Sequence, residues 1–339
     1  MSFNARFCIY VCLFWGLMSG LSGCLKDAPA DPGIEVPPGF PPPVIPSDNR
    51  PTAARIALGK KLFFDPRLSV DSTISCASCH HPARAFSDSV AVSPGIKGRR
   101  GTRNATPLIN LAWLDKVNKD GGVVKLDFQP VVPIEDENEM GFNMKRLAER
   151  LRHISEYDSL FQAAYKTEAT PFAITRALGC FLRTLVSANS PNDLFQRGQA
   201  SALSEAEKRG RRLFFGKARC GTCHHGFNLT NLEFVNIGLY EHYADRGRGR
   251  ITLDPADDGK FRVPTLRNIA LTAPYMHDGS LPDLRAVVDF YVEGGKAHPN
   301  KDRRIFPVPL SEDERLDLIR FLESLTDSAF LHNPAFRPE

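Results

Sequence analysis

The sequence predicts a mainly α-helical protein built from two copies of one module, with long loops. GKKLFF at residues 59–64 precedes CASCHH at residues 76–81, and the same order returns as GRRLFF at residues 210–215 and CGTCHH at residues 220–225. Apolar residues near these motifs recur at helical spacing, whereas the alternation typical of strands is scarce and short. Self-similarity of this kind indicates a duplicated structural unit.

The composition is that of an ordinary globular protein that can bury a hydrophobic core. The chain has 339 residues, of which 42% are hydrophobic and 24% are charged, which excludes disordered and collagen-like classes. The formal net charge of +4 is small, and basic residues are interspersed with acidic ones. The charge pattern therefore gives no support for nucleic-acid binding.

Residues 1–24 are predicted to be a secretory signal of the lipoprotein type. Arg6 precedes an apolar run at residues 7–21 that is too short for a confident membrane span. The run ends in LSGC, which resembles a lipobox, so Cys24 is the expected lipidation site; a plain secretory signal is the alternative. Leu25 follows where inner-membrane lipoproteins carry Asp, which implies a periplasmic protein anchored to the outer membrane.

A proline-rich linker and two domains are expected after the signal. Residues 25–51 are rich in proline, which disfavours helices and central strands and favours extended polyproline geometry. We interpret this segment as a stalk that holds the folded part off a membrane. The N-terminal domain is then expected over residues 52–195 and the C-terminal domain over residues 196–339, with the division near residues 189–199.

Further helices are predicted in both halves. Residues 144–161 and 171–186 have helical spacing. Two pairs match the capping-box pattern that begins a helix: Ser204 with Glu207, and Ser311 with Glu314. Apolar residues at helical spacing follow the second pair at Leu318, Phe321, Leu322 and Leu325. The last of these helices should be long and amphipathic, and it should close the second module.

The pattern Cys-x-x-Cys-His is the attachment signature of c-type haem. The thiols would add to the haem vinyl groups, and the histidine would ligate the iron. The candidate residues are Cys76, Cys79 and His80 in the first motif and Cys220, Cys223 and His224 in the second. A thioredoxin-like redox pair needs no adjacent histidine, and a zinc site made from both pairs would leave surplus ligands. We therefore predict two cytochrome c-like haem domains.

The remaining histidines and cysteine near these patterns have simpler interpretations. His81 and His225 follow the ligand positions and are expected at the surface or in hydrogen bonds. Cys180 lies in an apolar, helical segment and is expected to be a small buried residue.

Additional motifs resemble those of the bacterial di-haem cytochrome c peroxidase family, which also includes the di-haem enzyme that matures a tryptophan-derived quinone in methylamine utilisation. The resemblance spans residues 53–326. It rests on GRRGTRN at 98–104, PI at 133–134 with EMG at 139–141, VPTLRN at 263–268 and APYMHDG at 273–279. It implies that peroxide binds at the N-terminal haem and that electrons enter through the C-terminal haem.

The resemblance implies a peroxide pocket with Glu139 as the acid–base residue and Gln129 and Pro133 beside it. A carboxylate above the iron can accept a proton from peroxide and return it to the leaving oxygen. The alternative is that Glu139 is one more acid in a solvated loop. Residues 82–151 contain no histidine, and Ile96 stands where some family members place a histidine that closes the iron. The first haem is therefore expected to be open to peroxide as isolated.

The same resemblance implies further ligands around the second haem. Asn104, Thr272 and Pro274 match the ligands of a calcium ion between the haems, and oxygen-only ligation suits a hard cation. Tyr291 is the favoured sixth ligand of the second haem iron, and Met276 is the alternative. A tyrosinate lowers the reduction potential, while a thioether raises it.

One position departs from the family pattern. Lys119 aligns with a tryptophan that bridges the two haems in the family. Trp113 lies nearby in the sequence and is either a substitute for that bridge or a core residue. Because a lysine cannot hold an oxidising hole, this change argues against fast sharing of oxidising equivalents between the haems.

The predicted activity is the reduction of hydrogen peroxide to water by a small periplasmic cytochrome c or cupredoxin donor. The donor would dock near residues 220–225, and the basic clusters at 209–212 and 246–250 either assist docking or are solvated surface. One alternative is a high-valent di-haem oxidase acting on a protein or organic substrate. Another is a non-catalytic electron carrier or peroxide sensor. The family resemblance also suggests a homodimer.

Overall fold

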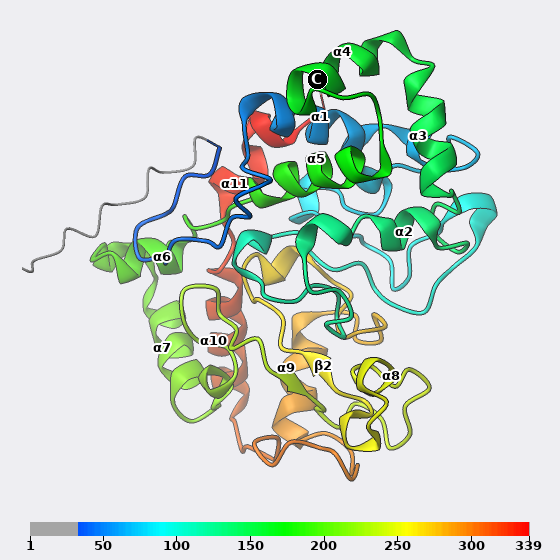
Figure 1. The fold of residues 1–339 in the computed structure, drawn as a ribbon. Helices are drawn as coiled ribbons and strands as arrows, with labels where there is room; N and C mark the ends of the chain where they lie inside the picture. Colours follow the sequence, from blue (N-terminus) through cyan, green and yellow to red (C-terminus); the bar gives the residue numbers. More distant parts are fainter. Residues whose placement is uncertain (1–32, 339) are drawn as a thin grey trace, which may run out of the picture. The chain divides into compact units, whose positions relative to one another are not determined.

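Helices dominate residues 33–338, the part of the chain that the computed structural model describes (Figure 1). The α-helices are α1 (Ala53–Phe64), α2 (Val131–Glu135), α3 (Met144–Arg152), α4 (Ser155–Tyr165), α5 (Pro171–Arg183), α6 (Pro191–Gln196), α7 (Glu205–Phe215), α8 (Gly249–Thr252), α9 (Leu284–Glu293), α10 (Glu312–Glu323) and α11 (Ser328–His332). Two short strands, β1 (Phe234–Val235) and β2 (Phe261–Arg262), pair antiparallel. The mainly α class is confirmed.

The two repeated segments form equivalent helix pairs. α1 packs against α5, and α7 packs against α10, as Figure 1 shows. A Cβ atom added to Gly59 would overlap the backbone carbonyl of Ala177, and one added to Gly210 would overlap that of Asp317. Only glycine permits so close an approach at these two positions. The sequence repeat therefore encodes a repeated helix crossing.

The phenylalanine pair after each glycine fills both crossings in the same way. In α1, the rings of Phe63 and Phe64 lie 5.3 and 6.4 Å from the ring of Phe181. In α7, the rings of Phe214 and Phe215 lie 5.1 and 6.3 Å from the ring of Phe321. Such tilted aromatic pairs contribute roughly 0.5–1.5 kcal/mol beyond the area that they bury.

The buried apolar residues form two main clusters. The first draws on residues 58–185, and the second on residues 214–325. Phe330 of α11 and the following Phe336 join the first cluster, and the ring of Phe330 lies 5.9 Å from that of Phe86. The end of the chain thus packs on the N-terminal module, and the domain boundaries stay a prediction.

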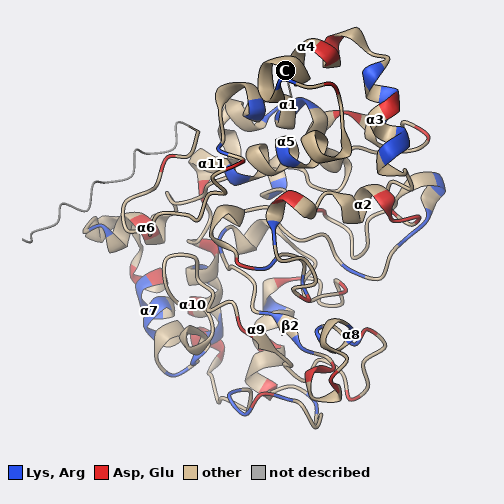
Figure 2. Ribbon diagram, in the orientation of Figure 1, with Lys and Arg blue, Asp and Glu red and all other residues tan. Residues whose placement is uncertain are grey.

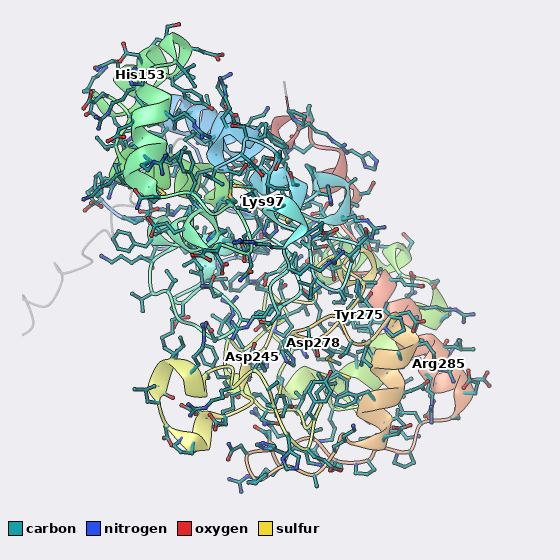
Figure 3. The ribbon with its side chains drawn as sticks, turned by 90° about the vertical axis from the view of Figure 1, so that its right-hand side faces the viewer. Lys97, His153, Asp245, Tyr275, Asp278 and Arg285 are labelled. Carbon is teal, nitrogen blue, oxygen red and sulfur yellow. The ribbon has the colours of Figure 1, made fainter. Side chains whose placement is uncertain are left out.

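The predicted capping boxes mark the first residues of two helices. Ser204 and Glu207 form a reciprocal capping box at α7, and Ser311 and Glu314 form one at α10. One helix was predicted too long: residues 144–161 are divided into α3 and α4, and the break follows His153, which is labelled in Figure 3. Cys180 is fully buried in α5, as predicted.

The predicted signal and lipidation site at Cys24 lie outside the described residues, whereas the linker from Gly33 onward is described. The ring of Phe40 packs 5.3 Å from Trp113 and 4.6 Å from Phe227. Trp113 Nε1 donates to the carbonyl of Pro41 at 2.6 Å. Buried Asn49 donates to the carbonyl of Arg176 at 3.1 Å. From Gly33 onward this segment therefore lies along the folded part and touches residues of both modules, so the interpretation of these residues as a free stalk is wrong.

Within residues 33–338, no helix combines the length and the apolar character that crossing a membrane requires.

Candidate active site

The first Cys-x-x-Cys-His motif faces a cavity of about 980 Å³, here called the N-terminal cavity. The motif begins as a single 3₁₀ turn, Cys76–Ser78. The lining residues include all six N-terminal site residues predicted from the sequence: Cys76, Cys79, His80, Gln129, Pro133 and Glu139. The fold thus brings the attachment motif and the predicted peroxide pocket together.

The second motif faces a smaller cavity of about 280 Å³, here called the C-terminal cavity. Cys220, Cys223 and His224 line it, together with apolar residues from α7, α9 and α10. Met276 and Tyr291, the two predicted candidates for the sixth ligand, line it as well.

Both motif histidines are held in the tautomer that suits iron ligation. Nδ1 of His80 lies 2.8 Å from the carbonyl oxygen of Phe86, and Nδ1 of His224 lies 3.2 Å from that of Leu229. Because a carbonyl only accepts, each Nδ1 carries the proton and each Nε2 keeps its lone pair. Burial lowers the pKa of His80, and it lowers that of His224 to about 4. Burial thus favours the neutral form of both rings, which is the form that can ligate iron.

The cysteines also fit covalent haem attachment. All four motif thiols are free, and burial raises the pKa of Cys76 and of Cys220 to about 12. The two pairs line two different cavities, and among residues 33–338 no group of three or more His, Cys, Asp or Glu side chains is placed to hold a metal ion. One zinc site made from both pairs is therefore ruled out by their placement.

Glu139 reaches the N-terminal cavity from the turn that follows α2. Its backbone N–H donates to the carbonyl of Asp136 at 3.1 Å, and its own carbonyl accepts from the N–H of Ile96 at 2.8 Å. The side chain is exposed because it faces the cavity, yet the surrounding protein removes part of its hydration. This desolvation, together with the negative charge of Asp136, raises the pKa of Glu139 to about 6. A carboxyl group with this pKa exchanges a proton readily near neutral pH.

Ile96 packs beside this turn, and its side chain is only 4% exposed. A Cβ atom added to the preceding Gly95 would overlap the carbonyl of Asn138. The segment that carries Ile96 therefore presses closely against the turn that carries Glu139.

Two histidines that sequence reasoning missed also line the N-terminal cavity. His242 and His277 both come from the C-terminal half of the chain. The ring of His277 stacks on Phe261 with centroids 4.1 Å apart, and it lines both cavities. A closing histidine is expected in residues 82–151 by family pattern, but His277 lies far downstream in the motif APYMHDG. The open first haem stays a prediction, and these two side chains are the ones that could contradict it.

The three predicted calcium ligands, Asn104, Thr272 and Pro274, all line the C-terminal cavity. The side-chain amide of Asn104 donates to the carbonyl of Val90 at 3.2 Å, which leaves its Oδ1 oriented for other partners. Calcium binding stays a prediction.

The two candidates for the sixth ligand differ in their local structure. Tyr291 belongs to α9, and burial raises the pKa of its hydroxyl. Met276 has a φ of 78°, in the left-handed region that is unusual for this residue type. The choice between them stays open.

Lys119 and Trp113 occupy different environments. Lys119 lines both cavities, so it lies in the wall that they share. Trp113 packs instead against Phe40 and Phe227. Trp113 is therefore not placed to replace the family's bridging residue.

One arginine of the first basic cluster and two of the second are ion-paired, and Figure 2 shows Lys and Arg prominently on α7. Arg209 pairs with Asp317 at 2.6 Å, Arg246 with Asp258 at 2.8 Å, and Arg250 with Asp120 at 2.7 Å. Such pairs reduce the net positive field that a docking partner would meet.

The chain thus repeats one helix crossing and one Cys-x-x-Cys-His motif, and each motif faces a cavity of its own, as expected of a protein with two c-type haem sites. The model of the di-haem cytochrome c peroxidase family matches residues 53–201. Relatives match most of the chain at up to 39% identity. The chain belongs to the di-haem cytochrome c peroxidase family, and membership implies two c-type haems and an oxidoreductase that acts on peroxide.

Relatives of two kinds match this chain. The methylamine utilization protein MauG of Methylorubrum extorquens is 39% identical, over 83% of this chain and 80% of its own length. The cytochrome c551 peroxidase of Pseudomonas aeruginosa is 32% identical, over 79% of this chain and 78% of its own length. Among solved structures, a MauG-like protein associated with microbial copper homeostasis superposes with a TM-score of 0.85 at 36% identity, covering 89% of this chain and 98% of that one.

Proposed function

We propose that the protein reduces hydrogen peroxide to water at the N-terminal cavity, with electrons that enter singly through the C-terminal site. The observation that supports this proposal most directly is the presence of Glu139 in the same cavity as His80. A pure electron carrier has no use for a proton-exchanging carboxyl group at this position.

In the N-terminal cavity, some residues would hold the haem and one would transfer protons. Cys76 and Cys79 would hold the haem through thioether bonds, and His80 would ligate its iron through Nε2. When bound, the haem supplies the electrons that break the O–O bond. Glu139 would accept a proton from the near oxygen of peroxide and return it to the leaving oxygen, which departs as water. Its pKa of about 6 suits both directions of this transfer.

Electrons would enter beside the second motif from a small cytochrome c or cupredoxin. His225 is exposed there, and its Nδ1 lies 3.1 Å from the carbonyl of Gly221. Because half of the arginines in the two basic clusters are ion-paired, we expect docking to depend on contact with this motif surface as well as on long-range attraction.

We further propose that the protein works in the periplasm, held to the outer membrane through Cys24, with a calcium ion bound by Asn104, Thr272 and Pro274. The signal pattern of residues 1–24 supports the export that c-type haem attachment requires. The two domains would divide near residues 189–199. Dimer formation is suggested by the family resemblance alone.

Oxidation of a protein or organic substrate is the second candidate. The observation that favours it is the presence of Tyr291 in the C-terminal cavity, in a chain that resembles the methylamine utilization protein MauG at 39% identity. Lys119, in the wall between the cavities, argues against it.

The variant Glu139→Gln tests the proposed function. We expect kcat/KM for peroxide to fall by ~10²- to 10⁴-fold, the usual contribution of a positioned acid–base group, with unchanged haem content and a reduced small cytochrome as donor. Glu137→Gln is the matched control, because the Glu137 carboxyl is 86% exposed and pairs loosely with Arg99 at 3.7 Å. Full activity in Glu139→Gln would show that the assigned proton transfer is wrong.

A further inference from the structure

The wall shared by the two cavities carries two cations, Lys119 and Arg262, which both line both cavities. They are held together by the backbone, because the N–H of Arg262 donates to the carbonyl of Lys119 at 2.7 Å. Arg262 belongs to β2, and Lys119 lies in the loop closed by the bridge between Val117 and Val123. Both positions are therefore fixed by regular backbone contacts.

Of the carboxylates around this wall, exposed Asp115 lies 3.8 Å from Lys116, and the others already have partners. Arg103 pairs with Asp120 at 2.7 Å and with Asp245 at 2.6 Å. Arg250 pairs with Asp120 from the other side at 2.7 Å. The carboxylate of Asp278 accepts from the hydroxyl of Tyr240 at 2.6 Å. Asp245 and Asp278 are labelled in Figure 3.

Lys119 and Arg262 have no such partner among residues 33–338. No carboxylate oxygen of these residues lies within 4.0 Å of a side-chain nitrogen of either cation. The guanidinium of Arg262 donates to the backbone carbonyl of Lys116 at 2.6 Å, a neutral acceptor. Burial, reinforced by Arg103 and Arg262, lowers the pKa of Lys119 to about 8, and burial lowers that of Arg262 to about 10.

Lys119 and Arg262 are half-buried in this wall, and covering a cation without a paired carboxylate is unfavourable, so an anion is expected beside them once the cavities are filled. Each haem carries two propionate carboxylates. Of the other arginines in the linings, Arg103, Arg246, Arg250 and Arg304 are already ion-paired, while Arg100 and Arg219 each line a single cavity. Charge-assisted hydrogen bonds from Lys and Arg to carboxylates are among the strongest polar contacts in proteins. The position of both cations in both linings makes them available to either haem.

We propose that Lys119 and Arg262 bind the propionate carboxylates of both haems, so that one pair of cations anchors the two cofactors. This inference rests on the haem attachment proposed above and not on the peroxidase reaction. A cation that neutralises a propionate favours the less positive, reduced iron. Loss of the cation should therefore lower the reduction potentials of both haems.

The test is a spectroelectrochemical titration of the holoprotein with the variants Lys119→Gln and Arg262→Gln. We expect the midpoint potentials of both haems to shift downward in each variant at full haem content, which the pyridine haemochrome assay measures. Lys119→Arg keeps the charge and should restore potentials close to those of the wild type. Lys125→Gln is the matched control, because Lys125 is an exposed lysine that lines neither cavity.

Three outcomes would overturn this inference. The first is unchanged potentials in fully loaded Lys119→Gln and Arg262→Gln. The second is a shift at one haem only. The third is a wild-type potential that depends on added acetate, an effect lost in Lys119→Gln, since the anion would then come from solution. If Lys119→Gln loses haem, Lys119→Met offers a neutral side chain of similar length. A wild-type chain that attaches no haem would instead contradict the proposed function.

Discussion

Glu139 carries the expected pH dependence of the reaction at the residue scale. Desolvation and the charge of Asp136 raise its pKa to about 6, so the carboxyl is protonated at lower pH and ionised at higher pH. Only the ionised form accepts the peroxide proton. We therefore expect kcat/KM for peroxide to rise with pH through about 6 and to level off above it, as measured in a pH–rate profile. Asp136→Asn should move this limb to lower pH, and an unmoved limb would contradict the assignment.

A second residue-scale prediction concerns Tyr291 and Met276 in the C-terminal cavity. If Tyr291 ligates the iron, Tyr291→Phe changes the absorption spectrum of the second haem and raises its potential, because a tyrosinate stabilises ferric iron. Met276→Leu should then leave that spectrum unchanged. The reverse result would assign the ligand to Met276.

At the scale of the elements, replacing the glycine of either helix crossing by alanine should destabilise the protein, although this substitution usually stabilises a helix. Gly→Ala inside an exposed helix normally stabilises it by about 0.5–1 kcal/mol. Here Gly59→Ala and Gly210→Ala should instead lower the free energy of unfolding by about 1–3 kcal/mol, since the new methyl group would force the helices apart. Denaturant unfolding of the holoprotein measures this. Ala163→Gly is the control, because Ala163 is exposed in α4 and the usual sign there predicts a loss of about 0.5–1 kcal/mol for glycine. Gly59→Ala and Gly210→Ala proteins at least as stable as the wild type would refute the crossing argument.

How far the sequence predicted the elements depended on the range of the interaction. The sequence alone predicted the capping boxes at Ser204 and Ser311 and the repeated glycine motifs, because each depends on residues a few positions apart. The break at His153 was missed because the apolar spacing continues across it. His242 and His277 were missed as cavity residues because the fold brings them to a motif more than 150 residues earlier in the chain. Residue spacing carries no information about such contacts.

The state of the first iron depends on the whole molecule, because the C-terminal half supplies His242 and His277 to the N-terminal cavity. We expect a high-spin signal from one haem in the paramagnetic resonance spectrum of the fully ferric, as-isolated protein, which indicates an open iron. Two low-spin haems would show that the site is closed. In that case the variants His242→Ala and His277→Ala would identify the closing side chain by restoring the high-spin signal.

The packing of Trp113 against the proline-rich segment provides an optical probe of that segment. The chain contains two tryptophans, and the other, Trp15, falls in the segment predicted to be removed on export. The mature protein would then carry a single indole fluorophore, enclosed by Phe40 and Phe227 and bonded to the backbone of the proline-rich segment. Because haem quenches indole emission by energy transfer, release of that segment would be followed as a change in the yield and wavelength of this one emission band.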